Sequence, residues 1–379
     1  MPLQQPLPQI YLSLSEGELT DRAARRKQEL GSSLVILGHH YQRDAVVELA
    51  DFVGDSLKLS QIAATQRSAR YIVFCGVHFM AESADILASP DQCVLLPHMM
   101  ATCSMAEMAE DAALEAALEE LSDLTDARIV PITYVNSTAA AKAITARAGG
   151  ACCTSSNVRN VFDWALTPAA KGGGGADKVF AVPDQNLGRN TAVAMGYNLE
   201  DCVVYDQSLP NGGLTKSQID AARFVLWKGH CYVHARFTPE HVRQVRDKHP
   251  GIRVIVHPEC PCEVVQLADA SGSTEQIIQA VDSGPRDQAW AIGTESNLVR
   301  RLAKRRPGQV IRELSDTPSL CRQMGRIDLP HLLWVLDELA EGRVVNRVSV
   351  DKATAADARV ALERMIGIKA VTGVTSSRQ

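Results

Sequence analysis

One pattern occurs three times along this 379-residue chain, and it constrains the fold more than any other feature. In each copy an apolar run of strand length ends in a short polar motif. A hydroxyl motif then precedes a predicted helix, a second strand ends in a polar turn, and a single cysteine follows. The polar motifs are VILGHHYQ (35–42), PITYVNS (131–137) and VIVHPEC (254–260), and the cysteines that close the copies are Cys103, Cys231 and Cys321. Self-similarity at a long period indicates repeated structural units, here roughly 100 residues each.

The strands of these units alternate with helices, which is typical of βαβ units and parallel sheets. Apolar runs predict strands at 34–37, 71–75, 128–135, 178–182, 253–256 and 290–292. Helical spacing of apolar residues predicts a helix over 105–121, and Thr238 as N-cap with Pro239 at the first position and Gly251 just past the end predicts another over 238–249. We therefore predict an α/β fold of three similar αβα parallel-sheet domains around a pseudo-threefold axis with a central active site. The predicted domains are an N-terminal tail (1–24), a first domain (25–102 plus 325–379), a second (103–230) and a third (231–324).

Composition limits the classes of function. Hydrophobic residues make up 46% and charged residues 22% of the chain, which is ordinary for a globular protein. The net charge of −5 argues against general binding of nucleic acid or anionic membranes. No apolar run reaches the roughly 18 residues of a membrane span, and the N-terminus lacks the features of a secretory signal. We expect a cytoplasmic protein without nucleic-acid or membrane partners.

The chain has ten cysteines, and none of them forms a Cys-x-x-Cys pair. Zinc ribbons and ferredoxin-type runs are therefore excluded, and a metal site must be assembled from distant segments. One cysteine per unit gives three, which suits a 4Fe–4S cluster with one open iron, because structural clusters normally take four. The competing interpretation is that the cysteines are small buried hydrophobic residues.

The hydroxyl motifs contribute Ser56, Ser155 and Thr274. Any one of them is explained by helix N-capping alone. Three such residues at three strand-to-helix junctions favour anion binding, because helix N-termini present free N–H groups.

Histidines and a glutamate complete the polar set at the predicted strand ends. His39 and His257 are compatible with a buried core, but Glu259 is costly to bury without a partner. Its position two residues after His257 favours proton chemistry.

Taken together, the motifs GHHYQ, ADFVGDS, GVHFMAES, ATCSMA, YVNST, TSSN, GHCYVH, HPEC and SGST resemble the quinolinate synthase A family of bacterial NAD biosynthesis over about residues 30–375. The resemblance implies condensation of iminoaspartate with dihydroxyacetone phosphate to quinolinate, phosphate and water. It implies three αβα domains and a 4Fe–4S cluster held by Cys103, Cys231 and Cys321, whose open iron is a Lewis acid. The implied site residues are His39, Tyr41, Ser56, Tyr134, Asn136, Ser155, His257, Glu259 and Thr274.

Within this set, Tyr41, His39, Glu259 and His257 are the expected catalytic residues, and the resemblance implies a functional link to L-aspartate oxidase, which makes iminoaspartate. The sequence departs from the family's pattern at Gln185, where a lysine is usual, at the isolated CxxM of 321–324, and in an enlarged segment before Cys231. Two alternatives stay open at this point: another 4Fe–4S-dependent hydro-lyase, and a non-catalytic iron–sulfur sensor.

Overall fold

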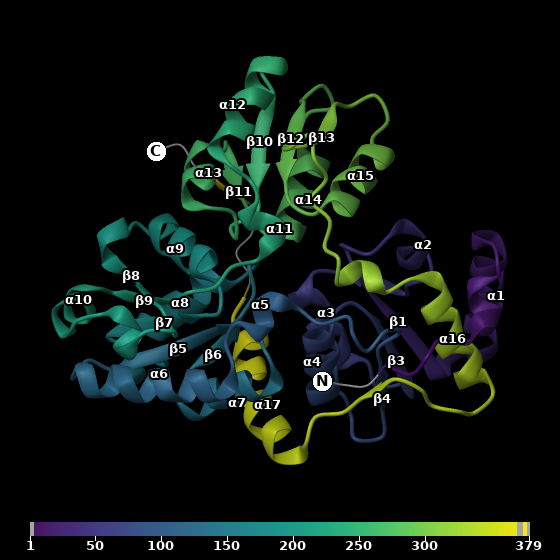
Figure 1. Ribbon diagram of the computed structural model, residues 1–379, viewed down its shortest axis with the longest axis horizontal. Coiled ribbons are helices and arrows are strands. Elements are labelled where there is room, and N and C mark those ends of the chain that lie inside the picture. Colours follow the sequence, from purple (N-terminus) through teal and green to yellow (C-terminus); the bar gives the residue numbers. More distant parts are fainter. Residues whose placement is uncertain (1–3, 370–373, 377–379) are drawn as a thin grey trace. The chain divides into compact units, whose positions relative to one another are not determined.

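A computed structural model describes residues 4–369 and 374–376. It contains three five-stranded sheets in which parallel pairing dominates, with helices beside each sheet (Figure 1). The predicted α/β class with three parallel-sheet layers is thereby confirmed. Two compact units make up the chain: residues up to Cys103 with Leu320–Lys352, and Ser104–Ser319 with the residues from Ala353 onward. No helix in the described ranges combines the length and the apolar character that crossing a membrane requires.

The sheet of the first unit has the strand order β14-β4-β3-β1-β2. Its first strand is a wholly buried apolar run that ends at His39, which is paired in register with Gly54 of the neighbouring strand. The two strand ends therefore lie at the same edge of the sheet. The strands are β1 (Leu34–His39), β2 (Phe52–Gly54), β3 (Tyr71–Cys75), β4 (Cys93–Leu95) and the antiparallel β14 (Arg347–Val348).

The helices of the first unit include two that are joined through a buried carboxylate. Asp337 of α16 accepts hydrogen bonds from Arg26 (2.7 Å) and from the hydroxyl of Tyr11 (3.0 Å). Arg22 also donates to Asp337, at 3.3 Å. Tyr11 and Arg22 of the predicted tail 1–24 thus contact Asp337, and the boundary at residue 24 stays a prediction. The elements are η1 (Gln9–Leu12), α1 (Glu16–Leu30), η2 (Gly31–Ser33), α2 (Asp44–Val47), α3 (Ser56–Thr65), α4 (His78–Leu87), η6 (Met324–Arg326) and α16 (Leu329–Ala340).

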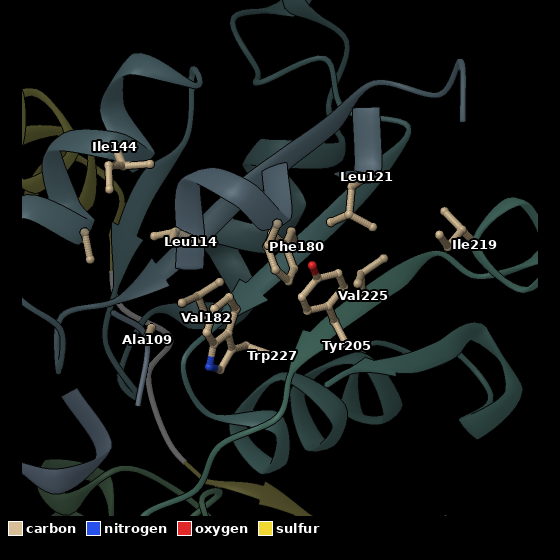
Figure 2. Close-up of a cluster of buried hydrophobic side chains, with 12 residues drawn as sticks. Ala109, Leu114, Leu121, Ile144, Phe180, Val182, Tyr205, Ile219, Val225 and Trp227 are labelled. Carbon is tan, nitrogen blue, oxygen red and sulfur yellow. The ribbon is translucent and has the colours of Figure 1, made fainter. Parts of the chain in front are cut away.

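The first sheet of the second unit is entirely parallel, in the order β6-β5-β7-β9-β8. Figure 2 shows the apolar cluster on one of its faces, where the rings of Phe180, Tyr205 and Trp227 pack against Leu114 and Leu121 of α6. The other face is also covered, because Phe224 packs against Phe162 of α8 with ring centroids 5.5 Å apart. The strands are β5 (Ile129–Tyr134), β6 (Ala151–Cys153), β7 (Lys178–Val182), β8 (Cys202–Tyr205) and β9 (Phe224–Trp227).

The predicted helix over 105–121 is two helices in the structure. Glu110 has extended backbone before α6 begins, and the indole N–H of Trp227 donates to the carbonyl of Met108 at 3.1 Å, which fixes the break. The helices of this part are α5 (Ser104–Glu107), α6 (Asp111–Leu124), α7 (Ala139–Arg147), α8 (Val158–Leu166), η3 (Ala169–Lys171), α9 (Gln185–Ala194), η4 (Leu199–Asp201), η5 (Pro210–Gly213) and α10 (Lys216–Ala221).

The remaining sheet of the second unit has the order β13-β12-β10-β11-β15, with only β15 antiparallel. Its strands are β10 (Arg253–Val256), β11 (Ala270–Ser271), β12 (Trp290–Gly293), β13 (Ile311–Glu313) and β15 (Thr375–Ser376). Its helices are α11 (Tyr232–Ala235), α12 (Pro239–Lys248), α13 (Cys262–Leu267), α14 (Thr274–Ser283) and α15 (Ser296–Arg305).

The C-terminal segment belongs with the second unit. In α17 (Lys352–Gly367) the guanidinium of Arg364 donates to the carbonyl of Gly150 at 2.5 Å, and β15 adds to the edge of β11. The predicted assignment of 325–379 to the first domain differs from this grouping after Lys352. The other predicted domain boundaries stay predictions.

Candidate functional site

A buried polar cluster lies at the carboxyl ends of two strands of the second unit. The hydroxyl of Tyr134, the last residue of β5, donates to Glu259 Oε1 at 2.6 Å. Glu259 follows β10, and its other oxygen lies 3.1 Å from His234 Nδ1 on α11. All three side chains are at most 6% exposed. The carboxylate is therefore held from both sides away from bulk water.

A second histidine completes this cluster. The ring of His257 stacks on that of His234 with centroids 4.3 Å apart, and the backbone N–H of Glu259 donates to His257 Nδ1 at 3.3 Å. The neutral ring of His257 thus carries its proton on Nε2. Burial, aided by the neighbouring His234, lowers the pKa of His257 to about 3. Burial alone would raise the pKa of Glu259, but His234, His257 and the hydrogen bonds from His234 and Tyr134 outweigh it and lower that pKa to about 2.

The depressed pKa of His257 predicts how stability changes with pH. An unfolded chain protonates this histidine near pH 6.5, whereas the folded protein does so near pH 3, so its contribution to stability is full above pH 6.5 and declines as the pH falls. Between pH 7 and pH 5.5 the wild type should lose about 1 kcal/mol more than His257→Gln. Denaturation of both proteins at the two pH values measures this difference. Equal losses would contradict the prediction, and so would NMR signals showing that His257 titrates near pH 6.5.

Cys231 lies beside this cluster. Its sulfur and one ligand atom each of His234 and Glu259 all lie within 4.8 Å of one another. The backbone N–H of Cys231 donates to Asp184 Oδ2 at 3.1 Å, and the other oxygen of Asp184 caps α9 by accepting from Leu187 N–H. Burial and the charge of Glu259 raise the pKa of Asp184 well above its usual range. The donor set of thiol, imidazole and carboxylate is one that metals favour.

The predicted anion-binding hydroxyls are not the helix N-caps. Thr274 is the first residue of α14, and the preceding Ser273 caps that helix by accepting from Gln276 N–H. Ser56 is likewise the first residue of α3, which Asp55 caps. Ser155 lies in the turn before α8, three residues ahead of its first residue, Val158. The N-capping explanation is therefore wrong for these three residues.

The two hydroxyl motifs of the second unit contact each other. Ser156 and Ser273 are joined by a hydrogen bond of 2.8 Å between their hydroxyls. Asn136, two residues after the end of β5, has a buried Oδ1 for which no hydrogen-bond partner is found in the described part of the chain. An orphaned buried acceptor on a predicted binding residue is consistent with a site that a ligand completes.

In the first unit the structure places two predicted residues of the first repeat, His39 and Tyr41, in contact. His39 ends β1, and the Tyr41 ring meets it edge-on with centroids 4.7 Å apart, while the Tyr41 backbone N–H donates to His39 Nδ1 at 3.1 Å. Gln42, three residues after the end of β1, donates to the Met324 sulfur at 3.4 Å. Met324 itself lies three residues after Cys321. The predicted meeting of these residues with those of the second unit in one central cavity stays a prediction.

Exposure separates the three predicted ligand cysteines from most others. Cys103, Cys231 and Cys321 are partly exposed, and of the other seven only Cys202 is. Burial raises the pKa of all seven of these thiols, to about 12 for Cys75 and Cys152, which opposes the thiolate form that iron needs. The remaining five with raised pKa values are Cys93, Cys153, Cys202, Cys260 and Cys262.

Sequence reasoning missed two members of the cluster. His234 follows Cys231 by three residues in GHCYVH, a spacing that places both on one helical turn. Asp184 lies in the polar turn PDQNLG that the repeat itself singles out. Both signals were present, but nothing in the sequence says which distant residue either one meets.

Histidine, tyrosine and carboxylate side chains at the carboxyl ends of parallel strands define an α/β enzyme of the class whose site lies at a sheet edge. Comparison with known proteins narrows this class. The family model described as Quinolinate synthetase A protein matches residues 21–367. Quinolinate synthase of Acidobacterium capsulatum is 52% identical over 363 residues, 95% of each chain. That of Streptomyces coelicolor is 51% identical over 360 residues, 94% of this chain and 90% of the relative. That of Anoxybacillus flavithermus is 49% identical over 360 residues, 95% and 96%.

The chain therefore belongs to the quinolinate synthase family, which serves NAD biosynthesis. Membership in a family of enzymes sets aside the alternative of a non-catalytic sensor.

Proposed function

We propose that this enzyme condenses iminoaspartate with dihydroxyacetone phosphate to give quinolinate, phosphate and two molecules of water. The observation that carries the proposal is the buried Glu259 carboxylate, which contacts Tyr134 and His234 and lies within 4.8 Å of the Cys231 sulfur. A base beside a metal-ligand cysteine is what a cluster-assisted dehydration requires. We further propose a cytoplasmic location and a supply of iminoaspartate from L-aspartate oxidase.

The cysteines present fit a 4Fe–4S cluster held by Cys103, Cys231 and Cys321. These thiols are partly exposed, whereas six of the other seven are buried. Three cysteine ligands leave one iron open, and when bound such a cluster supplies a Lewis acid for hydroxyl or carboxylate oxygens. The backbone N–H of Cys231 is fixed by Asp184, which supports the orientation of this ligand.

The side chains of the chain itself account for the proton transfers. We assign Glu259, ionised and held by Tyr134, to deprotonation and dehydration together with His257. His257 is neutral and carries its proton on Nε2, so this atom is a donor and Nδ1 stays engaged with the backbone. We assign His39 and Tyr41 to the ketone or hydroxyl of the triose. Tyr134 and Asn136 complete the substrate-binding set.

The hydroxyls of Ser56, Ser155 and Thr274 are proposed to hold the phosphate and carboxylates of the substrates. Because the neighbouring residues Asp55 and Ser273 do the capping, replacing Ser56 or Thr274 should leave the helices intact. Ser155→Ala should lower kcat/KM about 5- to 30-fold, the effect of about 1–2 kcal/mol for a hydrogen bond to a charged group. Ser283→Ala, which removes an exposed hydroxyl at the end of α14, is the control. Wild-type kinetics in all three site variants would refute anion binding by these hydroxyls.

The overall reaction is tested by incubating anaerobically purified enzyme with both substrates and measuring quinolinate and phosphate. Formation of both products only when both substrates are present supports the proposal. A hydro-lyase acting on one hydroxy acid would need only a single substrate and would release no phosphate, so the same assay tells the two reactions apart.

A further inference from the structure

Two asparagines of α9 bind the loop that carries His257 and Glu259. The amide of Asn190 donates to the carbonyls of Pro258 (2.7 Å) and Cys260 (2.8 Å), and the amide of Asn186 donates to the carbonyl of Glu259 (3.3 Å). The two asparagines are four residues apart and therefore lie on one face of the helix. Three consecutive carbonyls of this loop are thus bound by side chains of a single helix.

Asn190 makes the stronger part of this contact, and its amide does nothing else. The residue is 6% exposed, both of these hydrogen bonds use Nδ2, and its buried Oδ1 has no hydrogen-bond partner in the described part of the chain. No backbone N–H of the described residues is found to donate to the carbonyls of Pro258, Glu259 or Cys260. Burying an amide with an unsatisfied oxygen is costly, so an apolar residue would be preferred here if packing were the only requirement.

The helix that presents Asn190 is itself firmly placed. A Cβ atom on Gly188 would lie 2.7 Å from the Leu226 side chain and 3.0 Å from that of Ala181, so only glycine lets α9 come this close to β7 and β9. At its N-terminus, Asp184 joins α9 to the backbone of Cys231. The donors on α9 therefore act from a rigid support.

We infer that Asn190 is a positioning residue for the reaction: by holding the carbonyls on either side of Glu259, it keeps that carboxylate on Tyr134 and His234. The inference rests on the proposed acid–base role of Glu259. Misplacement of a catalytic group by about 1 Å costs on the order of 100-fold in rate. Loss of the hydrogen bonds from Asn190 should therefore lower kcat more than it raises KM.

The test compares two amide-to-acid substitutions at equally buried side chains, each of which donates from its amide nitrogen to two backbone carbonyls. Asn190→Asp places an acid against the two loop carbonyls. Gln92→Glu does the same at Gln92, which is also 6% exposed and donates to the carbonyls of Ala69 (2.7 Å) and Gln66 (2.9 Å). Gln92 lies next to the start of β4, at the opposite edge of its sheet from the end of β1 at His39. Both variants are purified anaerobically with their cluster, and iron content, melting temperature, kcat and KM are measured. Asn190→Ala, which introduces no negative charge, replaces Asn190→Asp if the latter does not fold.

Asn190→Asp is expected to keep full iron content and a KM within about threefold of wild type, with kcat lowered about 10- to 100-fold. Gln92→Glu should lower the melting temperature by a similar amount and leave kcat within about twofold. A crystal structure of Asn190→Asp should show the Glu259 carboxylate displaced from the Tyr134 hydroxyl. Unchanged kcat in the Asn190 variants, or an equal fall of kcat in Gln92→Glu, would overturn the inference.

Combining Asn190→Asp with Glu259→Gln distinguishes this inference from the function on which it rests. If Asn190 acts through Glu259, the double variant should be no slower than Glu259→Gln alone. A further 10-fold loss in the double variant would overturn the inference. Near-normal activity of Glu259→Gln would refute the acid–base role proposed for Glu259. The inference about Asn190 has a separate readout, because the crystal structure of Asn190→Asp shows whether the loop is displaced without reference to activity.

Discussion

Cys231→Ala is expected to abolish both iron binding and quinolinate formation. The cysteine is one of three partly exposed thiols proposed to hold the cluster, and its sulfur lies within 4.8 Å of a ligand atom of His234 and of Glu259. A cluster with three protein ligands has no spare cysteine to replace a lost one. Cys103→Ala and Cys321→Ala should have the same effect. Iron and sulfide content, together with absorbance at roughly 400–420 nm, measure the loss directly.

Cys202→Ala is the matched control for this experiment, because Cys202 is the remaining partly exposed cysteine. This variant should keep its cluster and its activity, and so should Cys152→Ala, whose thiol is buried with a pKa raised to about 12. Full iron content in Cys231→Ala would show that the ligand assignment is wrong. Loss of iron in Cys202→Ala would show that exposure does not identify the ligands.

Glu259→Gln is expected to lower kcat about 10²- to 10⁴-fold while the cluster is retained, which is the range for a general acid–base group. The pKa of Glu259 is lowered to about 2, so at neutral pH the side chain is a carboxylate that can accept a proton. Glutamine has nearly the same shape as glutamate and can still accept the hydrogen bond from the Tyr134 hydroxyl. Its neutral amide, however, cannot accept a proton from the substrate. Turnover of quinolinate by cluster-replete protein is the measurement.

Glu263→Gln serves as the control, since this exposed glutamate lies four residues further along the same segment, in α13. It should be indistinguishable from wild type in turnover and iron content. If cluster-replete Glu259→Gln made quinolinate within tenfold of wild type, Glu259 would be a structural carboxylate, and the base would have to be sought among the other residues of the site.

Local sequence patterns predict many of the helices and strands. A continuous apolar run predicts β10 at its observed bounds, and the N-cap Thr238 with Pro239 and Gly251 predicts α12 to within one residue at each end. The helix predicted over 105–121 failed at 108–110, because its break depends on a hydrogen bond from Trp227, more than 100 residues away. The hydrogen bond of Tyr11 to Asp337 is equally hidden from local patterns, because the two residues are 326 positions apart in the sequence.

The site divides in the same way. The residue types at the strand ends can be predicted from local sequence, because a strand that continues as VIVHPEC must carry His257 and Glu259 at the edge of its sheet. The partners of these residues depend on the packed fold: Tyr134 donates to Glu259 across 125 positions of sequence, Asp184 accepts from the backbone of Cys231, and Asn190 donates to the carbonyl of Pro258. Periodicity and N-capping, which local sequence does reveal, arise between residues a few positions apart. A buried hydrogen bond, in contrast, requires a particular distance and direction between two atoms, which the packing of whole elements sets.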